Sequence, residues 1–338
     1  MSTATGREMT RAERVQAALA GDPVDRPPIS LWMHFPNADQ SAEQLAESTT
    51  RWQTALDLDF IKLMPPGDYA CIDWGLQSEY RGAAGGTRDT TYFPIQTLDD
   101  WANVQPVDIT QGFNAEVVRA CTLARAAVGD DVPVLQTIFS PLTIANKLSD
   151  GRVIEHLRSN PDVIHDVLAV IEAVTIEMTR ASLAAGAQGI FFASQCASAE
   201  VMTRDEHDAF GVRHDLPVLL AAQAAGSGFT MVHVHGAQTY LDVLAAYPGH
   251  ALNWHDRRVG PTIASVLHDY PQRAAVAGID EHGMAALAVA EVREQVLDAR
   301  QQAQDRHLLL GPGCVIRTAT PAAQLRAAVA AARENQGR

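Results

Sequence analysis

The segments PVLQTI (Pro133–Ile138), NPDVIHDVLAVIEAVTIEMTRASLAA (Asn160–Ala185) and GIFFA (Gly189–Ala193) together decide the fold class. The first and third are short apolar runs of the kind that forms buried strands. The middle segment is amphipathic, has Pro161 at a suitable first helical position and is followed by Gly186, so we expect a helix. A strand, a helix and a second strand in this order predict parallel strands joined by a crossover helix.

The same alternation runs along the whole chain, with further helix-like stretches at Thr203–Gly226 and Gly283–Gln304. Such alternation favours an α/β fold, a single (β/α)8 TIM barrel over residues 1–338. The alternative, an open doubly wound sheet, is less favoured because no G-x-G-x-x-G motif follows the first run. The eight strand-like runs are Pro28–Met33, Asp59–Met64, Pro133–Ile138, Gly189–Ala193, Phe229–His235, Ala251–His255, Ala274–Gly278 and His307–Leu310.

Two segments fall outside the repeating pattern. The interval from Met64 to Pro133 is too long for one crossover, and we predict an insertion after the second strand, with a hairpin at Arg88–Ile95 and a helix near Ala115–Val128. Insertions of this kind on the C-terminal face of a barrel often build the pocket. Before the first strand, Thr10–Ala20 predicts a helical cap over the bottom of the barrel.

Composition restricts the classes of partner. The chain has 338 residues, of which 47% are hydrophobic, and 26 Lys and Arg against 40 Asp and Glu give a net charge of −14. This balance argues against nucleic acid, an anionic membrane surface or a polyanionic substrate. The N-terminus lacks an apolar signal segment, no apolar run approaches the ~18 residues of a membrane span, and the four cysteines form no CxxC pair. We therefore expect a cytoplasmic protein with reduced thiols.

The segment MVHVHG at Met231–Gly236 is the sharpest chemical feature of the sequence. Residues two apart on a strand point to the same side, so His233 and His235 can share one metal ion at the mouth of the barrel. Cys314, in GPGCVI just after the last run, can supply a thiolate. Two imidazoles and one thiolate suit one Zn²⁺ per chain with an open fourth position. The alternative is that the histidines only bond to backbone and that Cys314 is a buried apolar residue.

Other polar residues follow the predicted strands. We assign proton transfer to His255 and Asp280, although a polar strand end and a helix start would explain them equally. Cys71, Cys121 and Cys196 are interpreted as structural. Predicted substrate-binding residues at the mouth, each of which has an ordinary structural alternative, are His34, Tyr69, Asn146, Lys147, Gln195, Trp254 and Glu281.

Four segments carry a resemblance to the uroporphyrinogen decarboxylase-like superfamily, which includes zinc-dependent cobalamin:thiol methyltransferases. The resemblance covers nearly the whole chain and implies a single (β/α)8 barrel and a homodimer. The segments are RAERVQAALAGDPVDRPP (Arg11–Pro28), SPLTIANKLSDG (Ser140–Gly151), AGAQG (Ala185–Gly189) and the stretch from Cys314 through Thr320 and Pro321.

Within this superfamily the chain resembles the methyltransferase branch more than the true decarboxylases. The decarboxylase segment M-R-Q-A-G-R-Y corresponds to residues 33–39 here, which lack arginine; the tyrosine of A-T-Y falls on Lys147 and the histidine of G-H-G on Pro312. His233 and Cys314 match two zinc ligands of the methyltransferase branch, whereas His235 stands where that branch has cysteine. Replacing thiolate by imidazole leaves the ion with more positive charge.

The leading hypothesis is zinc-dependent transfer of a methyl or small alkyl group to a thiol. No corrinoid-binding D-x-H-x-x-G site is present, so the alkyl donor is either a small molecule or a separate corrinoid protein. A zinc lyase, decarboxylase or hydrolase acting on a small carboxylate or carbonyl compound is the alternative enzyme, with His255 or Asp280 as the proton-transfer group. A metal-free binding or regulatory barrel is the alternative outside enzymology.

Overall fold

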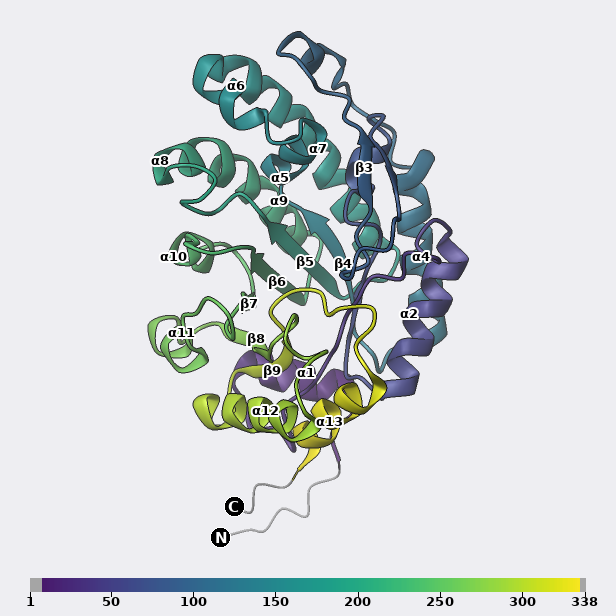
Figure 1. The fold of residues 1–338 in the computed structure, drawn as a ribbon, viewed down its shortest axis with the longest axis vertical. Helices are drawn as coiled ribbons and strands as arrows, with labels where there is room; N and C mark the ends of the chain where they lie inside the picture. The colour runs from purple at the N-terminus through teal and green to yellow at the C-terminus, as the bar shows by residue number, and fades with distance from the viewer. Residues whose placement is uncertain (1–7, 335–338) are drawn as a thin grey trace.

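The computed structural model describes residues 8–334 and confirms the predicted α/β barrel class. In this part of the chain the main sheet has seven strands, all parallel to their neighbours, in the order β1-β4-β5-β6-β7-β8-β9 (Figure 1). Every residue of these strands is buried, which explains why they read as continuous apolar runs. Their bounds are β1 Ile61–Leu63, β4 Val134–Phe139, β5 Gly189–Ser194, β6 Phe229–Val234, β7 Ala251–Asn253, β8 Ala274–Ile279 and β9 Leu308–Pro312.

The predicted first strand, Pro28–Met33, is an extended segment with a single β-bridge rather than a regular strand. Ile29 bridges to Leu310 of β9, and Asp59, just before β1, donates its N–H to the Ile29 carbonyl at 2.8 Å. This segment therefore closes the barrel between β9 and β1. A full ladder does not form because Pro28 has no N–H and because the Ile29 N–H donates to the Asp59 carboxylate.

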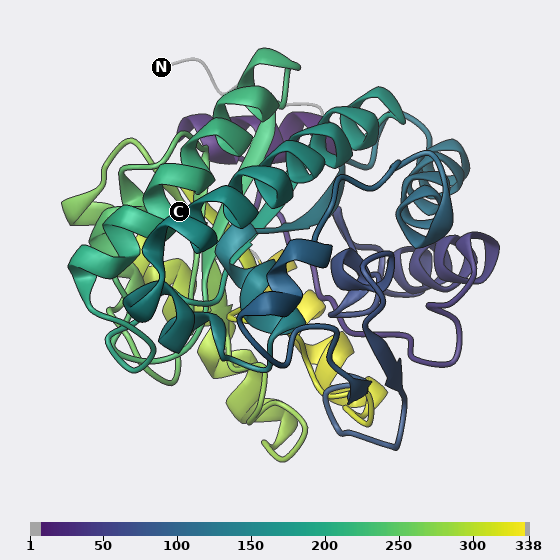
Figure 2. The same ribbon diagram turned by 90° about the horizontal axis from the view of Figure 1, so that it is seen from above.

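Helices surround the strands on the outside, as the view from above shows (Figure 2). Aromatic pairs cross the interior, including Phe60 with Phe229 at 5.4 Å between ring centroids. The α-helices are α1 Arg11–Ala20, α2 Ala42–Leu56, α3 Tyr69–Ile72, α4 Gly112–Val128, α5 Pro141–Leu148, α6 Val153–Ser159, α7 Pro161–Ala184, α8 Arg204–His207, α9 Arg213–Ala224, α10 Leu241–Ala245, α11 Ile263–Asp269, α12 Val289–Ala303 and α13 Ala322–Arg333.

The predicted N-terminal cap and the long crossover helix are confirmed as α1 and α7, but two other helices differ from prediction. The stretch Thr203–Gly226 contains a π-helical turn, η2 (Asp208–Val212), where the buried ring of His207 packs over Gly211. Helix α12 begins at Val289 rather than Gly283, because Asp280 organises the preceding residues into turns and Glu291 accepts the Ala288 N–H.

The insertion after β1 is present, but its hairpin starts earlier than Arg88. Strand β2 (Gln77–Glu79) pairs antiparallel with β3 (Asp89–Tyr92), and the 3-10 helix η1 (Asp99–Asn103) follows. The loop between the two strands reaches the segment after β9, where the Thr318 N–H donates to the Ala84 carbonyl at 2.9 Å. The insertion therefore lies beside the loop that carries Cys314.

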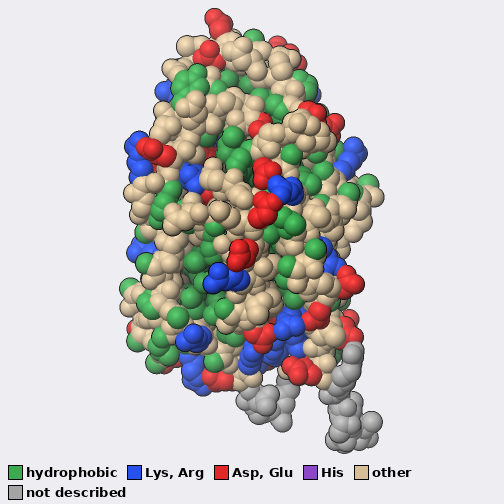
Figure 3. All heavy atoms as spheres, turned by 90° about the vertical axis from the view of Figure 1, so that its right-hand side faces the viewer, with side chains coloured by type: hydrophobic (Ala, Val, Ile, Leu, Met, Phe, Trp, Pro, Cys, Tyr) green, Lys and Arg blue, Asp and Glu red, His purple; other side chains and the backbone are tan. Residues whose placement is uncertain are grey.

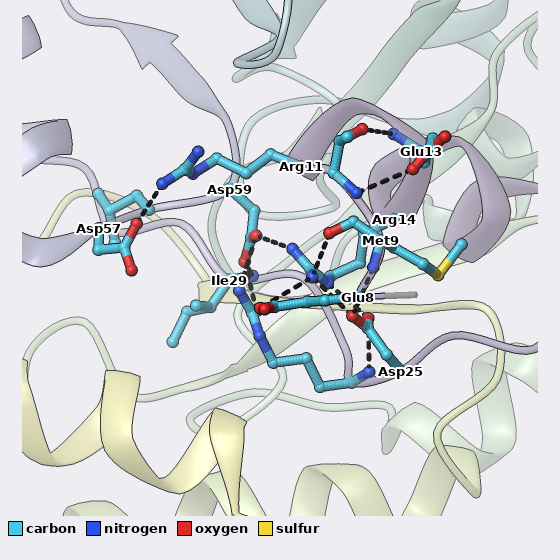
Figure 4. Close-up of polar contacts among 12 residues, drawn as sticks. Glu8, Met9, Arg11, Glu13, Arg14, Asp25, Ile29, Asp57 and Asp59 are labelled. Carbon is cyan, nitrogen blue, oxygen red and sulfur yellow. Dashed lines mark hydrogen bonds and ion pairs between the residues drawn. The ribbon is translucent and has the colours of Figure 1, made fainter. Parts of the chain in front are cut away.

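A buried ion network joins α1 to the barrel closure (Figure 4). The fully buried carboxylate of Asp59 accepts hydrogen bonds from Arg14 at 2.8 Å, Arg26 at 2.6 Å and 3.0 Å, and the Ile29 N–H at 2.8 Å. Arg14 is itself buried and also donates twice to Asp25, at 2.7 Å each. One carboxylate thus ties the cap helix, the segment at residues 25–29 and the entry to β1 together.

On the face shown in Figure 3, acidic and basic side chains are intermixed with hydrophobic atoms, and no single charge dominates. Among residues 8–334, no helix combines the length and the hydrophobicity that a membrane span requires.

We expect Asp59→Ala to destabilise the protein by about 3–5 kcal/mol, because it removes the buried carboxylate that accepts from Arg14 Nη1, from Arg26 and from the Ile29 N–H. Urea denaturation monitored by circular dichroism measures the loss. Glu47→Ala, which removes an exposed partner of Arg51, is the control and should change the midpoint little. Equal effects of the two variants would contradict the structural role of Asp59.

The Asp215–Tyr247 pair predicts a pH-dependent stability. Burial raises the pKa of Asp215 to about 8, and the Tyr247 hydroxyl donates to its carboxyl at 3.0 Å. The unfolded chain releases this proton near pH 4, so the stability contributed by Asp215 is full below pH 4 and falls as the pH rises to about 8. Between pH 5 and 7, we expect the ratio of the folding equilibrium constant of Asp215→Asn to that of the parent to rise by roughly tenfold per pH unit. Asp89→Asn, at an exposed position, should show no such trend.

Candidate metal centre

Three histidines and one cysteine converge at the C-terminal ends of the strands. His233 lies in β6, His235 follows β6, His255 follows β7 and Cys314 follows β9. One ligand atom from each residue lies within 4.8 Å of the ligand atom of every other. The predicted set of His233, His235 and Cys314 is thus brought together, and His255, predicted to transfer protons, joins it.

His233 is held by Asn253 of the neighbouring strand. The strand register pairs the two residues, and Nδ1 of His233 lies 2.6 Å from Oδ1 of Asn253. The Asn253 amide donates to the carbonyls of Val276 at 2.7 Å and Pro312 at 3.1 Å, so its oxygen is left to accept. This network assigns the proton of His233 to Nδ1 and leaves the lone pair of Nε2 for the cluster.

His255 is held in the same way by Glu281, which follows β8. Nδ1 of His255 lies 2.6 Å from Oε1 of the fully buried Glu281 carboxylate. Burial opposes the ionisation of Glu281, but the hydrogen bond from His255 prevails and keeps the pKa of Glu281 below its usual value. An ionised Glu281 accepts the Nδ1 proton, and Nε2 of His255 is then free to bind a metal.

His235 and Cys314 form the accessible side of the cluster. Nδ1 of His235 lies 3.3 Å from Nε2 of His255 and 3.8 Å from Sγ of Cys314. Both residues are partly exposed, whereas His233 and His255 are buried. A small molecule can therefore approach the four ligand atoms only from the side of His235 and Cys314.

Burial sets the protonation of these groups. It lowers the pKa of His233 well below the usual value and that of His235 to about 4, and neighbouring histidines add to both shifts. Neutral imidazole is the form that binds metal. Burial also raises the pKa of the Cys314 thiol, against which the Val315 N–H and the charge of Lys62 act.

Lys62 is a buried amine beside this cluster that the sequence analysis did not select. Its Nζ lies 4.1 Å from the ring centroid of Phe191, whose ring stacks on His233 at 5.0 Å. Burial lowers the pKa of Lys62 to about 7. Among the described residues its only hydrogen-bond partner is the Met64 sulfur, so no carboxylate neutralises it.

The remaining predicted site residues divide into two groups. Asn146 and Lys147 line a cavity at the mouth, and His34 is buried nearby, where burial and the charge of Lys62 lower its pKa to about 3. The other predicted residues are engaged by the fold.

Four of the engaged residues make specific polar contacts. The Tyr69 hydroxyl donates to the Thr137 carbonyl at 2.7 Å, and the Trp254 indole donates to the Pro261 carbonyl at 2.8 Å. Gln195 donates its backbone N–H to Thr143. Asp280 accepts the N–H groups of His282 and Gly283 and lies outside the four-residue cluster.

Asn253 and Lys62 were within reach of sequence reasoning. Both lie within predicted strands, Asp59–Met64 and Ala251–His255, and the composition gave a further signal: Lys62 and Lys147 are the only two lysines of the chain, against 24 arginines. A residue type that occurs twice and both times at the mouth of the barrel is a site candidate on that ground alone.

The cluster is tightly packed around Gly313, which leaves no room for a side chain at this position. A Cβ at this position would lie 2.8 Å from the Trp254 carbonyl oxygen and 2.9 Å from both Glu281 Oε2 and His255 Cα. We expect Gly313→Ala to weaken zinc binding by about tenfold or more, because it displaces His255 and Cys314 from one another. Competition with a chromogenic chelator measures the affinity. Gly85→Ala, where nothing lies within 4 Å, should bind zinc as the parent does; an unchanged affinity for Gly313→Ala would contradict this packing argument.

Comparison with known proteins places these features in a family context. Methylcobamide:CoM methyltransferase MtbA of Methanosarcina acetivorans is 20% identical over 348 aligned residues, which cover 96% of this chain and 98% of that protein. A solved methyltransferase from Methanosarcina mazei superposes with a TM-score of 0.82 at 21% identity, covering 96% of this chain and 98% of the other. A B12-independent methionine synthase from Shewanella sp. W3-18-1, solved with selenomethionine, gives a TM-score of 0.58 at 14% identity and 92% coverage of each chain.

The family model for uroporphyrinogen decarboxylase (URO-D) matches residues 10–335, which is nearly the whole of the sequence. The fold, the opening and closing motifs and the two methyltransferase relatives agree with this match. The chain belongs to the uroporphyrinogen decarboxylase family.

Proposed function

We propose that this chain is a zinc-dependent enzyme that transfers a methyl or other small alkyl group to a thiol. The observation that carries the proposal is the convergence of His233, His235, His255 and Cys314 within 4.8 Å. The similarity to MtbA, a methylcobamide:CoM methyltransferase, supports methyl transfer and a donor carried by a separate corrinoid protein.

The spacing of the ligand atoms suits tetrahedral zinc. Zinc–nitrogen bonds of about 2.0–2.1 Å and zinc–sulfur bonds of about 2.3 Å place neighbouring tetrahedral ligand atoms roughly 3.3–3.6 Å apart. Nδ1 of His235 lies 3.3 Å from Nε2 of His255 and 3.8 Å from Sγ of Cys314. Asn253 and Glu281 each accept the Nδ1 proton of one ring and so point the Nε2 lone pairs of His233 and His255 toward the cluster.

The chain's own residues provide the remaining chemistry. Bound zinc supplies positive charge that lowers the pKa of a thiol and so raises the fraction of nucleophilic thiolate. The acceptor thiol enters from the exposed side, beside His235 and Cys314. With His233, His235 and Cys314 as the ligands, Nε2 of His255 would stay off the ion and accept the proton of the thiol, and Glu281 would stabilise the resulting imidazolium through Nδ1. The sulfur–carbon bond then forms as the bond between the methyl group and its donor breaks.

One observation favours zinc-dependent lyase, decarboxylase or hydrolase chemistry as a second candidate. The two neutral imidazoles of His233 and His235 and the Cys314 thiolate give the ligand set a formal charge of −1, which makes a bound ion a stronger Lewis acid than a second thiolate would allow. Decarboxylation of a porphyrinogen is not proposed, because residues 33–39 lack arginine and the nearby Arg88 is already paired with Asp39 at 2.6 Å.

Elemental analysis of protein purified without added metal tests the centre. We expect about one zinc per chain, reduced about tenfold or more in Cys314→Ala and in His235→Ala, since each change removes a direct ligand. His282→Ala, which removes an exposed imidazole close to Glu281, is the control and should keep its zinc. The same four proteins are assayed for methylation of a thiol by free methylcobalamin.

The outcomes separate the candidates. Zinc with thiol methylation that disappears in the ligand variants supports the transferase. Zinc without methylation, but with turnover of a small acid, favours the second candidate. Protein that neither contains zinc nor takes it up under reducing conditions would overturn both and favour a metal-free binding barrel.

A further inference from the structure

The polar cavity that Asn146 and Lys147 line at the mouth of the barrel is separate from the four metal-binding candidates. Its volume is about 290 Å³. Asp68, from the loop after β1, and Asn146 and Lys147, from α5 after β4, line it together with Arg88 of the insertion. Loops that follow strands of a barrel lie on one face, so the cavity opens on the same face as the metal centre.

Asp68 is a buried carboxylate without a partner. The residue is 8% exposed, and neither carboxylate oxygen has a hydrogen bond or an ion pair among the described residues. Removing a carboxylate from water without compensation is costly, and such groups are usually paired. The cavity is therefore built to receive a group that donates to Asp68.

Lys147 is an unpaired cation on the same cavity. Its Nζ lies 5.0 Å from the ring centroid of Phe139, and among the described residues it has no hydrogen bond and no ion pair. This is notable in a chain with 40 acidic residues and only two lysines. By contrast, Arg88 on this cavity is held by Asp39 and by the Pro36 carbonyl. Lys147 is thus an unpaired cation on the cavity that the unpaired carboxylate of Asp68 also lines.

We propose that this cavity binds a zwitterionic small molecule, with its ammonium group on Asp68 and its acid group on Lys147. The inference rests on the proposed function, because it names the acceptor as a thiol of the amino-acid type. A thiol that carries only an acid group would leave Asp68 unpaired and repelled, and a thiol that carries only an amine would leave Lys147 unpaired. The charge of Lys147 also acts on Cys314 and His235, which agrees with a short path from cavity to metal centre.

Calorimetry with zinc-loaded protein tests whether binding requires both the ammonium group and the acid group of the ligand. The probes are cysteine and homocysteine, 3-mercaptopropionate without the ammonium group, and cysteamine without the acid. We expect one of the amino acids to bind at least tenfold more tightly than both single-charge thiols. Asp68→Asn should remove the advantage over 3-mercaptopropionate, and Lys147→Gln should remove the advantage over cysteamine. Glu47→Gln, which changes an exposed carboxylate outside the lining of this cavity, is the matched control and should bind as the parent.

A second measurement does not depend on the metal. Protein labelled with ε-¹³C-lysine gives two lysine side-chain signals, one of which is assigned to Lys147 by its loss in Lys147→Gln. Titration with 2-aminobutyrate, a zwitterion without sulfur, should shift the Lys147 signal, and the shift should be weaker in Asp68→Asn. Binding with no thiol methylation would leave the cavity assignment standing and count against the transferase. Equal binding of single-charge and zwitterionic thiols, or an unmoved Lys147 signal, would overturn the inference.

Discussion

The hydrogen bond between His233 and Asn253 is the interaction on which the centre depends. Asn253 lies in β7, accepts from β6 and donates to carbonyls of β8 and β9, so one fully buried amide satisfies groups on three other strands of the barrel. A shift of register by one residue would turn its side chain away and leave those polar groups buried without partners. The bond that stabilises the register of β6 against β7 therefore also fixes which nitrogen of His233 faces the cluster.

The fold and part of the candidate metal centre could be predicted from the sequence, whereas the contacts between distant residues that complete the centre could not. The parallel strand order follows from the alternation of strands and helices. The placement of His233 and His235 on one side of their strand follows from its side-chain period of two, which is a local property. The bond between His255 and Glu281 joins residues 26 positions apart, and no spacing rule connects them. The approach of Cys314 depends on the absence of a side chain at Gly313, where an added Cβ would lie 2.8 Å from the Trp254 carbonyl oxygen, and only the assembled barrel reveals this.

The errors at Pro28–Met33 and Gly283–Gln304 have a common cause. Both segments have the right composition for a regular element, but in each a carboxylate accepts backbone N–H groups, which interrupts the ladder at Ile29 and holds the residues before α12 in turns. Asp59 takes the Ile29 N–H, and Asp280 takes those of His282 and Gly283. Apolar periodicity reports which face is buried and says nothing of such side-chain competition for the backbone.

The charge distribution at the mouth argues for a small acceptor rather than a porphyrinogen. The family's decarboxylases meet many carboxylates with arginines, whereas here the segment at residues 28–33 is followed by the buried, neutral His34, and Arg88 forms an ion pair with Asp39. Among the described residues at the mouth, Asp68 and the two lysines have no ion pair; Lys62 lies beside the metal centre and Lys147 lies on the cavity. A binding site with so few unpaired charges matches a ligand with few charges of its own, because each surplus charge on the ligand would be buried without a counterion.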